Sequence, residues 1–201
     1  MIELLFPTPI IMEKLEKPFT MEELIQIEKE FTSCSKSKEN IVSINGYVLD
    51  NPIFKNLKEI LTNHINEYIK TVYKPLHPVK AYITQSWLNY GTENNYHSIH
   101  NHPNSFISGV MYIEADRNTD SILFINSAYK QINLEPTSYD NLNANTWKVP
   151  VNTGDIIIFP SNLAHGVDTV DSKRHRVSIA FNSFIKGKLG SINESTELIL
   201  E

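Results

Sequence analysis

Apolar residues in the first third of the chain recur with the period of an α-helix. Residues 19–31 place three of them on one face: Leu24, Ile27 and Phe31. Thr20 and Glu23 have the spacing of a capping box, in which the side chain of each residue binds the backbone N–H of the other. This pattern predicts a helix over residues 19–31 that begins at Thr20.

A second helical pattern follows after a polar segment. Asn51 can cap this helix, and Pro52 suits its first turn. Its apolar stripe has seven members: Phe54, Leu57, Leu61, Ile65, Tyr68, Ile69 and Val72. The apolar residues 1–16 precede both helices and predict a first strand.

From residue 80 onward the pattern changes to one typical of β-strands. Stretches rich in β-branched and aromatic residues are separated by polar or glycine-containing turns: residues 80–91, 105–115, 121–127, 146–151, 154–161 and 174–185. Their spacing predicts an antiparallel sandwich or barrel, with the two helices packed against its outside. The polar stretch 127–146 exceeds ordinary loop length, and we interpret it as a lid over an open mouth.

Composition supports a single globular domain and disfavours nucleic acid and a membrane as partners. The chain has 201 residues, of which 41% are hydrophobic and 20% charged. A formal net charge of −5 and the lack of a long basic run disfavour nucleic acid as a partner. No segment approaches the roughly 20 apolar residues of a membrane-spanning helix. The single cysteine, Cys34, fits a reducing cytoplasm.

Three of the seven histidines lie within residues 97–102. Side chains two positions apart on a strand point to the same face, so His100 and His102 converge if this stretch is extended. His97 then points the other way or lies in the preceding loop. Two imidazoles on one face can supply adjacent ligands to a metal ion, and His165, after the apolar stretch "DIIIFP", is the candidate third ligand. The alternative is a polar loop with ordinary hydrogen bonds.

The stretch "RVSIAFN" near the C-terminus has two different faces. One face suits a core: Val177, Ile179 and Phe181. The other face is mostly polar: Arg176, Ser178, Ala180 and Asn182. A buried arginine needs an anion, and its planar guanidinium matches a carboxylate. Arg176 is therefore a candidate carboxylate clamp, and the alternative is a structural ion pair with Asp155 or Asp168.

Four stretches together resemble the 2-oxoglutarate and iron(II)-dependent oxygenase family of phages and bacteria, which is related to the prolyl-4-hydroxylase-like enzymes. They are "LFPTPI", "HNHPNSFISGVMY", "GDIIIFPSNLAHGV" and "RVSIAFN". The resemblance implies a mainly β fold with N-terminal helices and a double-stranded β-helix core, also called a jelly roll or cupin-like core. In a single domain 1–201, residues 80–186 form this core, residues 1–79 pack a strand and helices on its sheet, and residues 187–201 form a tail.

The resemblance also implies a metal centre that acts in catalysis. Its ligands are His100, His102 and His165, and its metal is Fe(II). The wider superfamily has an aspartate or glutamate where His102 stands. An acidic residue, Asp116 or Asp120, is therefore the alternative third ligand, although both are expected to be solvated turn residues.

The implied cosubstrate is 2-oxoglutarate, whose distal carboxylate Arg176 and Ser178 are expected to hold. Three further residues are weaker candidates for lining the same pocket: Tyr112, Asn89 and Asn182.

The implied protein is a non-haem Fe(II) dioxygenase that uses O2 and couples oxidative decarboxylation of 2-oxoglutarate to hydroxylation of an unidentified substrate. That substrate is a small molecule or a peptidyl side chain, and ascorbate is a candidate reductant. The implied location is the cytoplasm, that of the host if the chain is phage-encoded, and a homodimer is compatible with the sequence. The alternative is a cupin-like three-histidine metal-binding protein that does not use 2-oxoglutarate.

Overall fold

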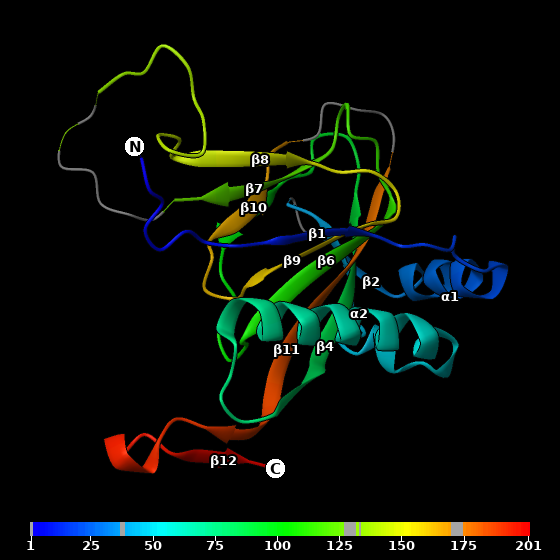
Figure 1. The fold of residues 1–201 in the computed structure, drawn as a ribbon. Helices are drawn as coiled ribbons and strands as arrows, with labels where there is room; N and C mark the ends of the chain where they lie inside the picture. The colour runs from blue at the N-terminus through cyan, green and yellow to red at the C-terminus, as the bar shows by residue number, and fades with distance from the viewer. Residues whose placement is uncertain (1, 37–38, 127–131, 133, 170–174) are drawn as a thin grey trace.

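Two antiparallel sheets face each other in the computed structural model (Figure 1), which describes residues 2–36, 39–126, 132, 134–169 and 175–201. The larger sheet has the order β1 (Ile11–Lys14), β9 (Asp155–Pro160), β6 (Ile107–Glu114), β11 (Arg176–Leu189), β4 (Val79–Gly91), β3 (Ile41–Ser43) and β2 (Cys34–Lys36). The smaller sheet has the order β5 (His97–His100), β10 (His165–Val167), β7 (Ser121–Ile125) and β8 (Thr146–Pro150). This architecture confirms the predicted antiparallel sandwich.

The larger sheet is apolar on both faces because both faces are covered. Residues of β6 alternate between the two sides: Met111 joins a core shared with the helices, and Val110 and Tyr112 join a core between the sheets. On β9, Ile158 and Ile157 divide in the same way. Since successive side chains on a strand point to opposite faces, a near-continuous apolar run is what a doubly covered strand requires.

Helices α1 (Met21–Phe31) and α2 (Lys55–Tyr68) cover the outer face of the larger sheet, as predicted (Figure 1). Thr20 caps α1, and its side chain and that of Glu23 form the expected capping box. Asn51 and Pro52 begin a short 3-10 helix, η2 (Pro52–Phe54), rather than α2 itself. A second 3-10 helix, η1 (Val48–Asp50), precedes it, and a π-helical turn, η3 (Ile69–Tyr73), follows α2.

The chain ends in a hairpin that projects beyond the sandwich (Figure 1). Residues 187–201, expected as a tail, include η4 (Ile192–Glu194) and β12 (Leu198–Leu200), and β12 pairs with the end of β11.

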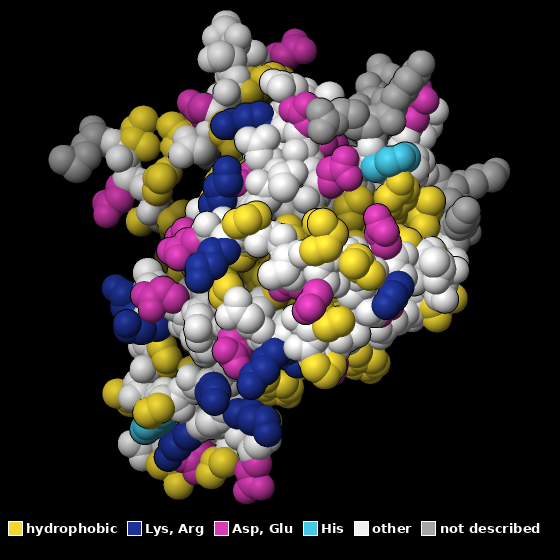
Figure 2. All heavy atoms as spheres, turned by 90° about the vertical axis from the view of Figure 1, so that its right-hand side faces the viewer, with side chains coloured by type: hydrophobic (Ala, Val, Ile, Leu, Met, Phe, Trp, Pro, Cys, Tyr) yellow, Lys and Arg dark blue, Asp and Glu magenta, His cyan; other side chains and the backbone are white. Residues whose placement is uncertain are grey.

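Charged side chains are distributed without a large patch of one sign on the described part of the face in Figure 2, where Lys and Arg are interspersed with Asp and Glu. Among the described residues, no helix combines the length and apolar character needed to cross a membrane.

The capping box gives a direct test of the N-terminal helix. The Thr20 hydroxyl oxygen accepts the Glu23 backbone N–H at 3.2 Å. Replacing Thr20 by Ala removes this acceptor and is expected to lower the free energy of unfolding by about 1 kcal/mol. Denaturant unfolding followed by circular dichroism measures the change. Glu28→Ala, at an exposed position within the same helix, is the control and should change stability by less than about 0.5 kcal/mol. Equal effects of the two substitutions would contradict the role of the cap.

Candidate metal centre and anion pocket

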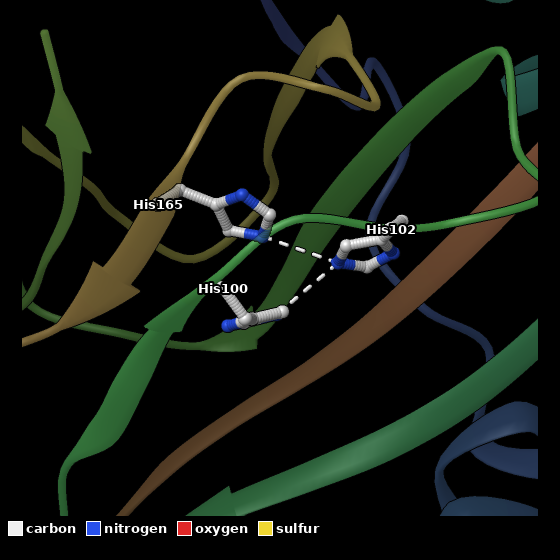
Figure 3. Close-up of side chains that lie close together, drawn as sticks. All are labelled: His100, His102 and His165. Carbon is white, nitrogen blue, oxygen red and sulfur yellow. Dashed lines mark hydrogen bonds between the residues drawn. The ribbon is translucent and has the colours of Figure 1, made fainter. Parts of the chain in front are cut away.

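Three imidazole rings converge where β5 ends and β10 begins (Figure 3). The Nε2 atom of His102 lies 3.2 Å from Nε2 of His100 and 3.2 Å from Nε2 of His165. A metal ion that binds each nitrogen at about 2.0–2.1 Å holds adjacent ligand atoms about 2.9–3.4 Å apart. The three rings therefore have the spacing needed to share one ion.

The other nitrogen of each ring is already engaged by a hydrogen-bond acceptor. Nδ1 of His100 lies 2.8 Å from the backbone oxygen of Ser98, and Nδ1 of His165 lies 2.9 Å from that of Leu163. Nδ1 of His102 contacts Oδ1 of Asn182. Because an oxygen acceptor requires a proton on Nδ1, each neutral ring presents an unprotonated Nε2. Three nitrogen lone pairs thus point toward one space, and a cation placed there can satisfy all of them.

The orientation of the His100 and His102 rings depends on an irregularity of β5 and not on the simple alternation of side chains along a strand. Strand β5 ends at His100, so His102 lies beyond the strand and the two histidines do not share it as expected. His165 pairs with His100, and Val167 pairs with His97. Two residues of β5 therefore lie opposite one residue of β10, which is a β-bulge.

The bulge also corrects the expected placement of His97. Its ring centroid lies 4.4 Å from that of His100, whereas the sequence placed it on the opposite face or in the preceding loop. A glycine permits this close approach of the two strands, because a Cβ on Gly166 would lie 2.8 Å from the His97 carbonyl oxygen.

Burial favours the neutral form of three imidazoles, those of His97, His102 and His165. The pKa of His165 is lowered to about 3: burial is the largest cause, the nearby histidines also lower it, and a hydrogen bond to the Leu163 backbone opposes them. Burial also lowers the pKa of His102 and, with help from His100 and Arg176, lowers the pKa of His97 to about 4. Neutral imidazole is the form that binds a metal, so the site is prepared for a cation at neutral pH.

Acidic residues do not join the three nitrogens within the part of the chain that the structure describes, where only the histidines form a group with metal-ligand spacing. Asp116 and Asp120 lie in the turn between β6 and β7, where the Asp120 carboxylate accepts the Asp116 backbone N–H at 2.8 Å. Asp120 is buried, which corrects the expectation of a solvated side chain.

A cavity behind the histidines holds a buried guanidinium. Arg176 lines this cavity together with the three histidines, and its side chain is almost fully buried. Its Nη1 atom is buried and has no hydrogen-bond partner among the described residues. Since a buried charge without a partner is strongly unfavourable, the position calls for an anion. Gly91 leaves room for the group, because a Cβ there would lie 3.1 Å from Nη2.

The ion pairs that were the alternative role for Arg176 are not formed in the described part of the molecule. Asp168 pairs with Lys148, and the Asp155 carboxylate accepts the Asn152 backbone N–H at 2.7 Å. A carboxylate from outside the chain therefore has no competitor among these groups.

The remaining predicted pocket residues divide between two places. Ser178, Tyr112 and Asn89 line the cavity that contains Arg176. Asn182 does not line it and instead contacts His102, while its Oδ1 also accepts a hydrogen bond from the Ser108 hydroxyl at 2.8 Å.

Sequence reasoning missed Trp87, which we expect from the sequence to be a core or lid-packing aromatic. Its ring stacks on that of His102 with centroids 5.6 Å apart, and it lines the cavity. The available signal was the alternation on β4, which places Trp87 on the same face as Asn89 while Leu88 enters the core.

The predicted lid is only partly described. Residues 127–131 and 133 of that stretch lie outside the described residues. Asn141, Leu142, Ala144 and Asn145 line a separate groove with residues 4–8, and no histidine is among the described residues that line it.

A comparison with protein families matches residues 85–182 to the family described as "Putative 2OG-Fe(II) oxygenase". The matched segment contains all three histidines and Arg176. This match confirms the resemblance to 2-oxoglutarate and iron(II)-dependent oxygenases. No curated protein matches this chain in sequence.

Solved structures of this class share the fold. HygX from Streptomyces hygroscopicus, solved with nickel, 2-oxoglutarate and hygromycin B bound, is 13% identical, with a TM-score of 0.57 over 88% of this chain and 83% of HygX. A Pseudomonas putida prolyl-4-hydroxylase is 11% identical, with a TM-score of 0.54 over 87% of this chain and 92% of that one. The epimerase SnoN from nogalamycin biosynthesis is 10% identical, with a TM-score of 0.62 over 88% and 78%. These likenesses establish the double-stranded β-helix fold.

The contact between Asn182 and His102 predicts a measurable effect on metal binding. Asn182→Ala removes the acceptor that holds the proton on Nδ1 of His102, and is expected to weaken Zn(II) affinity about 10–100-fold. Asn182→Asp keeps an acceptor and should retain most of the affinity. Competition with a chromophoric chelator gives the dissociation constants.

Ser183→Ala is the matched control for these variants. Ser183 is the next residue of the same strand and is equally buried, but its hydroxyl donates to the Ile107 carbonyl at 2.6 Å and does not contact the site. Its Zn(II) affinity should equal that of the parent protein. Equal affinities in the Ala and Asp variants of Asn182 would contradict the proposed role of the acceptor.

The lowered pKa values predict how the stability of the metal-free protein depends on pH. Below about pH 6.5 the unfolded chain takes up protons at His97 and His165 that the folded chain, with pKa values of about 4 and 3, does not. The free energy of unfolding should therefore decrease as pH falls from 6.5 toward 4. Denaturant unfolding in EDTA measures this slope, and His165→Gln should make it shallower. An unchanged slope in that variant would contradict the prediction.

Proposed function

We propose that this chain is a 2-oxoglutarate-dependent Fe(II) dioxygenase that hydroxylates its substrate. One observation carries the proposal: a single cavity is lined both by three convergent imidazoles and by a buried guanidinium with an unpartnered nitrogen. A metal ion fits the first group and a carboxylate fits the second. 2-Oxoglutarate has a carboxylate at each end, so one molecule can engage both.

In the proposed reaction, 2-oxoglutarate, O2 and a substrate C–H give succinate, CO2 and C–OH, and iron(II) supplies the oxygen-activating chemistry. The role of His100, His102 and His165 is to bind the iron through Nε2. Three neutral ligands leave the full charge of the ion uncompensated, which favours an anionic cosubstrate.

The role of Arg176 is to bind and orient the distal carboxylate of 2-oxoglutarate. Its guanidinium is fixed by burial and can donate two parallel hydrogen bonds. The Ser178 hydroxyl, two residues along the same strand face, is placed to add a third. Apolar and aromatic side chains complete the cavity and exclude water: Trp87, Val110, Ile122 and Phe159.

The unpartnered Arg176 favours this function over the cupin-like alternative. A metal-binding protein that does not use an anionic cosubstrate has no use for an uncompensated buried cation next to its metal. The family match over residues 85–182 supports the same choice.

Succinate release tests the proposal. Purified protein incubated with Fe(II), ascorbate, O2 and 2-oxoglutarate should form succinate even without its own substrate. His165→Ala should abolish this turnover because it removes a ligand. Arg176→Ala should raise the 2-oxoglutarate concentration for half-maximal turnover about 30-fold or more, which corresponds to about 2 kcal/mol.

Matched controls are available for both substitutions. His175→Ala and Arg117→Ala remove the same side-chain types at exposed positions outside the cavity and should leave turnover unchanged. Metal binding without succinate formation under any condition would favour the cupin-like alternative. An unchanged response of Arg176→Ala to 2-oxoglutarate would refute the carboxylate clamp.

A further inference from the structure

A broad cleft lies on the outer side of the histidines. Its volume is about 750 Å³, within the range typical of small-molecule sites. It shares five residues with the cavity that contains Arg176: Trp87, Asn89, His97, His100 and His102. A group bound in the cleft therefore lies beside two of the proposed metal ligands, where a substrate has to be.

The described lining of this cleft is polar but uncharged apart from any protonated histidine. It contains six carboxamide side chains: Asn40, Gln85, Asn89, Asn101, Asn104 and Asn182. No Lys, Arg, Asp or Glu is among the described lining residues. A carboxamide carries both donors and an acceptor, so the lining can match groups that both donate and accept hydrogen bonds. The oxygen of Asn182 is the exception, because it already accepts from His102 and Ser108.

The cleft and the inner cavity thus differ in electrostatic character. The inner cavity has a buried guanidinium, which suits the dianionic cosubstrate. In the outer cleft, a charged ligand would lose water without gaining an opposite charge from the described lining, which is unfavourable by several kcal/mol when burial is deep. An uncharged ligand avoids this loss.

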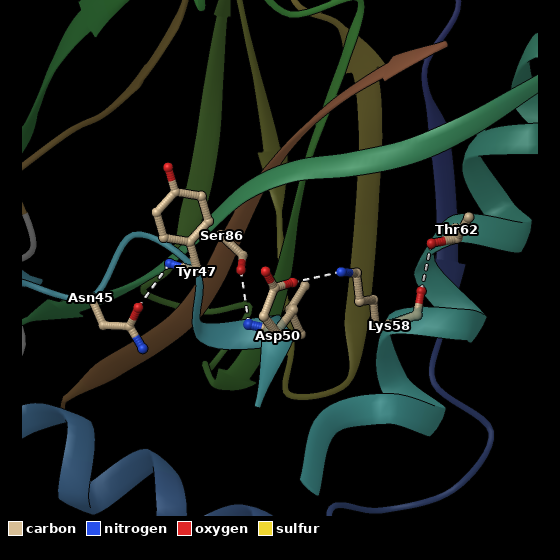
Figure 4. Close-up of polar contacts among 7 residues, drawn as sticks. Asn45, Tyr47, Asp50, Lys58, Thr62 and Ser86 are labelled. Atoms are coloured by element: carbon tan, nitrogen blue, oxygen red, sulfur yellow. Dashed lines mark hydrogen bonds and ion pairs between the residues drawn. The ribbon is translucent and has the colours of Figure 1, made fainter. Parts of the chain in front are cut away.

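Two aromatic side chains add flat apolar surface to the cleft. Trp87 is held in place by its stacking on His102. Tyr47 is anchored by its backbone, since its N–H donates to Oδ1 of Asn45 at 2.9 Å, and its ring stands apart from these polar contacts (Figure 4). Tyr47 is 55% exposed and lines the cleft, where a ligand can contact it.

Aliphatic side chains are scarce in the same lining. Only Val42 and Pro103 occur among the described residues, so the cleft offers no apolar pocket for the side chain of a peptide. A sugar ring fits better, because its hydroxyl groups both donate and accept hydrogen bonds and its C–H face can lie on an aromatic ring.

We propose that the outer cleft binds an uncharged, polyhydroxylated group of one or two sugar rings, which is the substrate of the oxidation. The proposal for the reaction rests on the proposed function, whereas the proposal for binding does not.

Fluorescence of Trp87 can report the binding. The chain has two tryptophans, so Trp147→Phe leaves Trp87 as the sole indole. This protein, loaded with Zn(II) and 2-oxoglutarate, is titrated with maltose, cellobiose and N,N′-diacetylchitobiose. It is also titrated with closely similar monosaccharides that differ in charge: glucose against glucosamine, and glucose against glucuronate. We expect saturable changes with the neutral compounds and at least tenfold weaker binding of each charged counterpart.

A charge placed in the cleft should change this preference. Gln85→Glu is nearly isosteric and is expected to improve glucosamine binding and weaken glucuronate binding, each several-fold, with little effect on neutral sugars. Asn193→Asp adds the same charge at an exposed position in η4, outside the cleft lining, and should change none of these affinities.

The proposal is overturned if no neutral saccharide gives a saturable change, or if a charged counterpart binds more tightly than its neutral partner. Tighter binding of a neutral peptide, tested with acetyl-prolinamide and acetyl-glutaminamide, overturns the sugar assignment as well. Succinate formed without any saccharide judges the proposed function separately. The Zn(II) protein does not turn over, so each proposal can fail while the other stands.

Discussion

Three unprotonated imidazole nitrogens directed at one space are the constraint on which the site depends. Each ring donates its Nδ1 proton to a fixed oxygen, so none can turn its lone pair away without losing a hydrogen bond. Protonation does not relieve the crowding, because burial holds the pKa of His165 and of His102 below the usual value. A cation is the remaining way to stabilise the arrangement, and the hydrogen-bonded oxygens ensure that the rings are oriented before it binds.

Strand β11 connects this constraint to the rest of the fold. Ile179 and Phe181 on one face are fully buried in the core under the helices. That packing fixes the opposite face, which presents Arg176 and Ser178 to the cavity and Asn182 to His102. The same strand therefore anchors the hydrophobic core, the proposed carboxylate clamp and the orientation of a metal ligand, and movement of one would disturb the others.

The inner cavity and the outer cleft on either side of the histidines suit ligands of different charge. The inner one contains a buried cation and is enclosed by apolar side chains, whereas the outer one is broad and lined by carboxamides. The inner cavity is therefore expected to favour an anion, and the outer cleft an uncharged group. Such a division keeps a dianion and a neutral ligand from competing for one position, because each hollow is unfavourable for the other ligand.

Local pattern was sufficient for much of this protein. The capping box of α1, the apolar stripe of α2 and the two faces of β11 depend on neighbours a few residues apart, so the sequence predicted them correctly. The exception is Val72, the last member of the predicted stripe, which is exposed. The three histidines were also identified, since two are close in sequence and the third follows an apolar strand. In the structure the Nε2 atom of His102 lies 3.2 Å from that of His100 and 3.2 Å from that of His165, and metal binding by these rings stays a prediction.

Tertiary structure decided what depends on strand pairing. The bulge in β5 turned His97 toward His100 against the alternation expected of a regular strand, because one extra residue reverses the face of every side chain beyond it. The contact of Asn182 with His102 joins residues 80 positions apart, and no periodicity within either segment contains that information. The sequence by itself identified the side chains that we propose carry the chemistry. Only the pairing of distant strands determined where each ring points, since direction is set by neighbours that the local chain does not include.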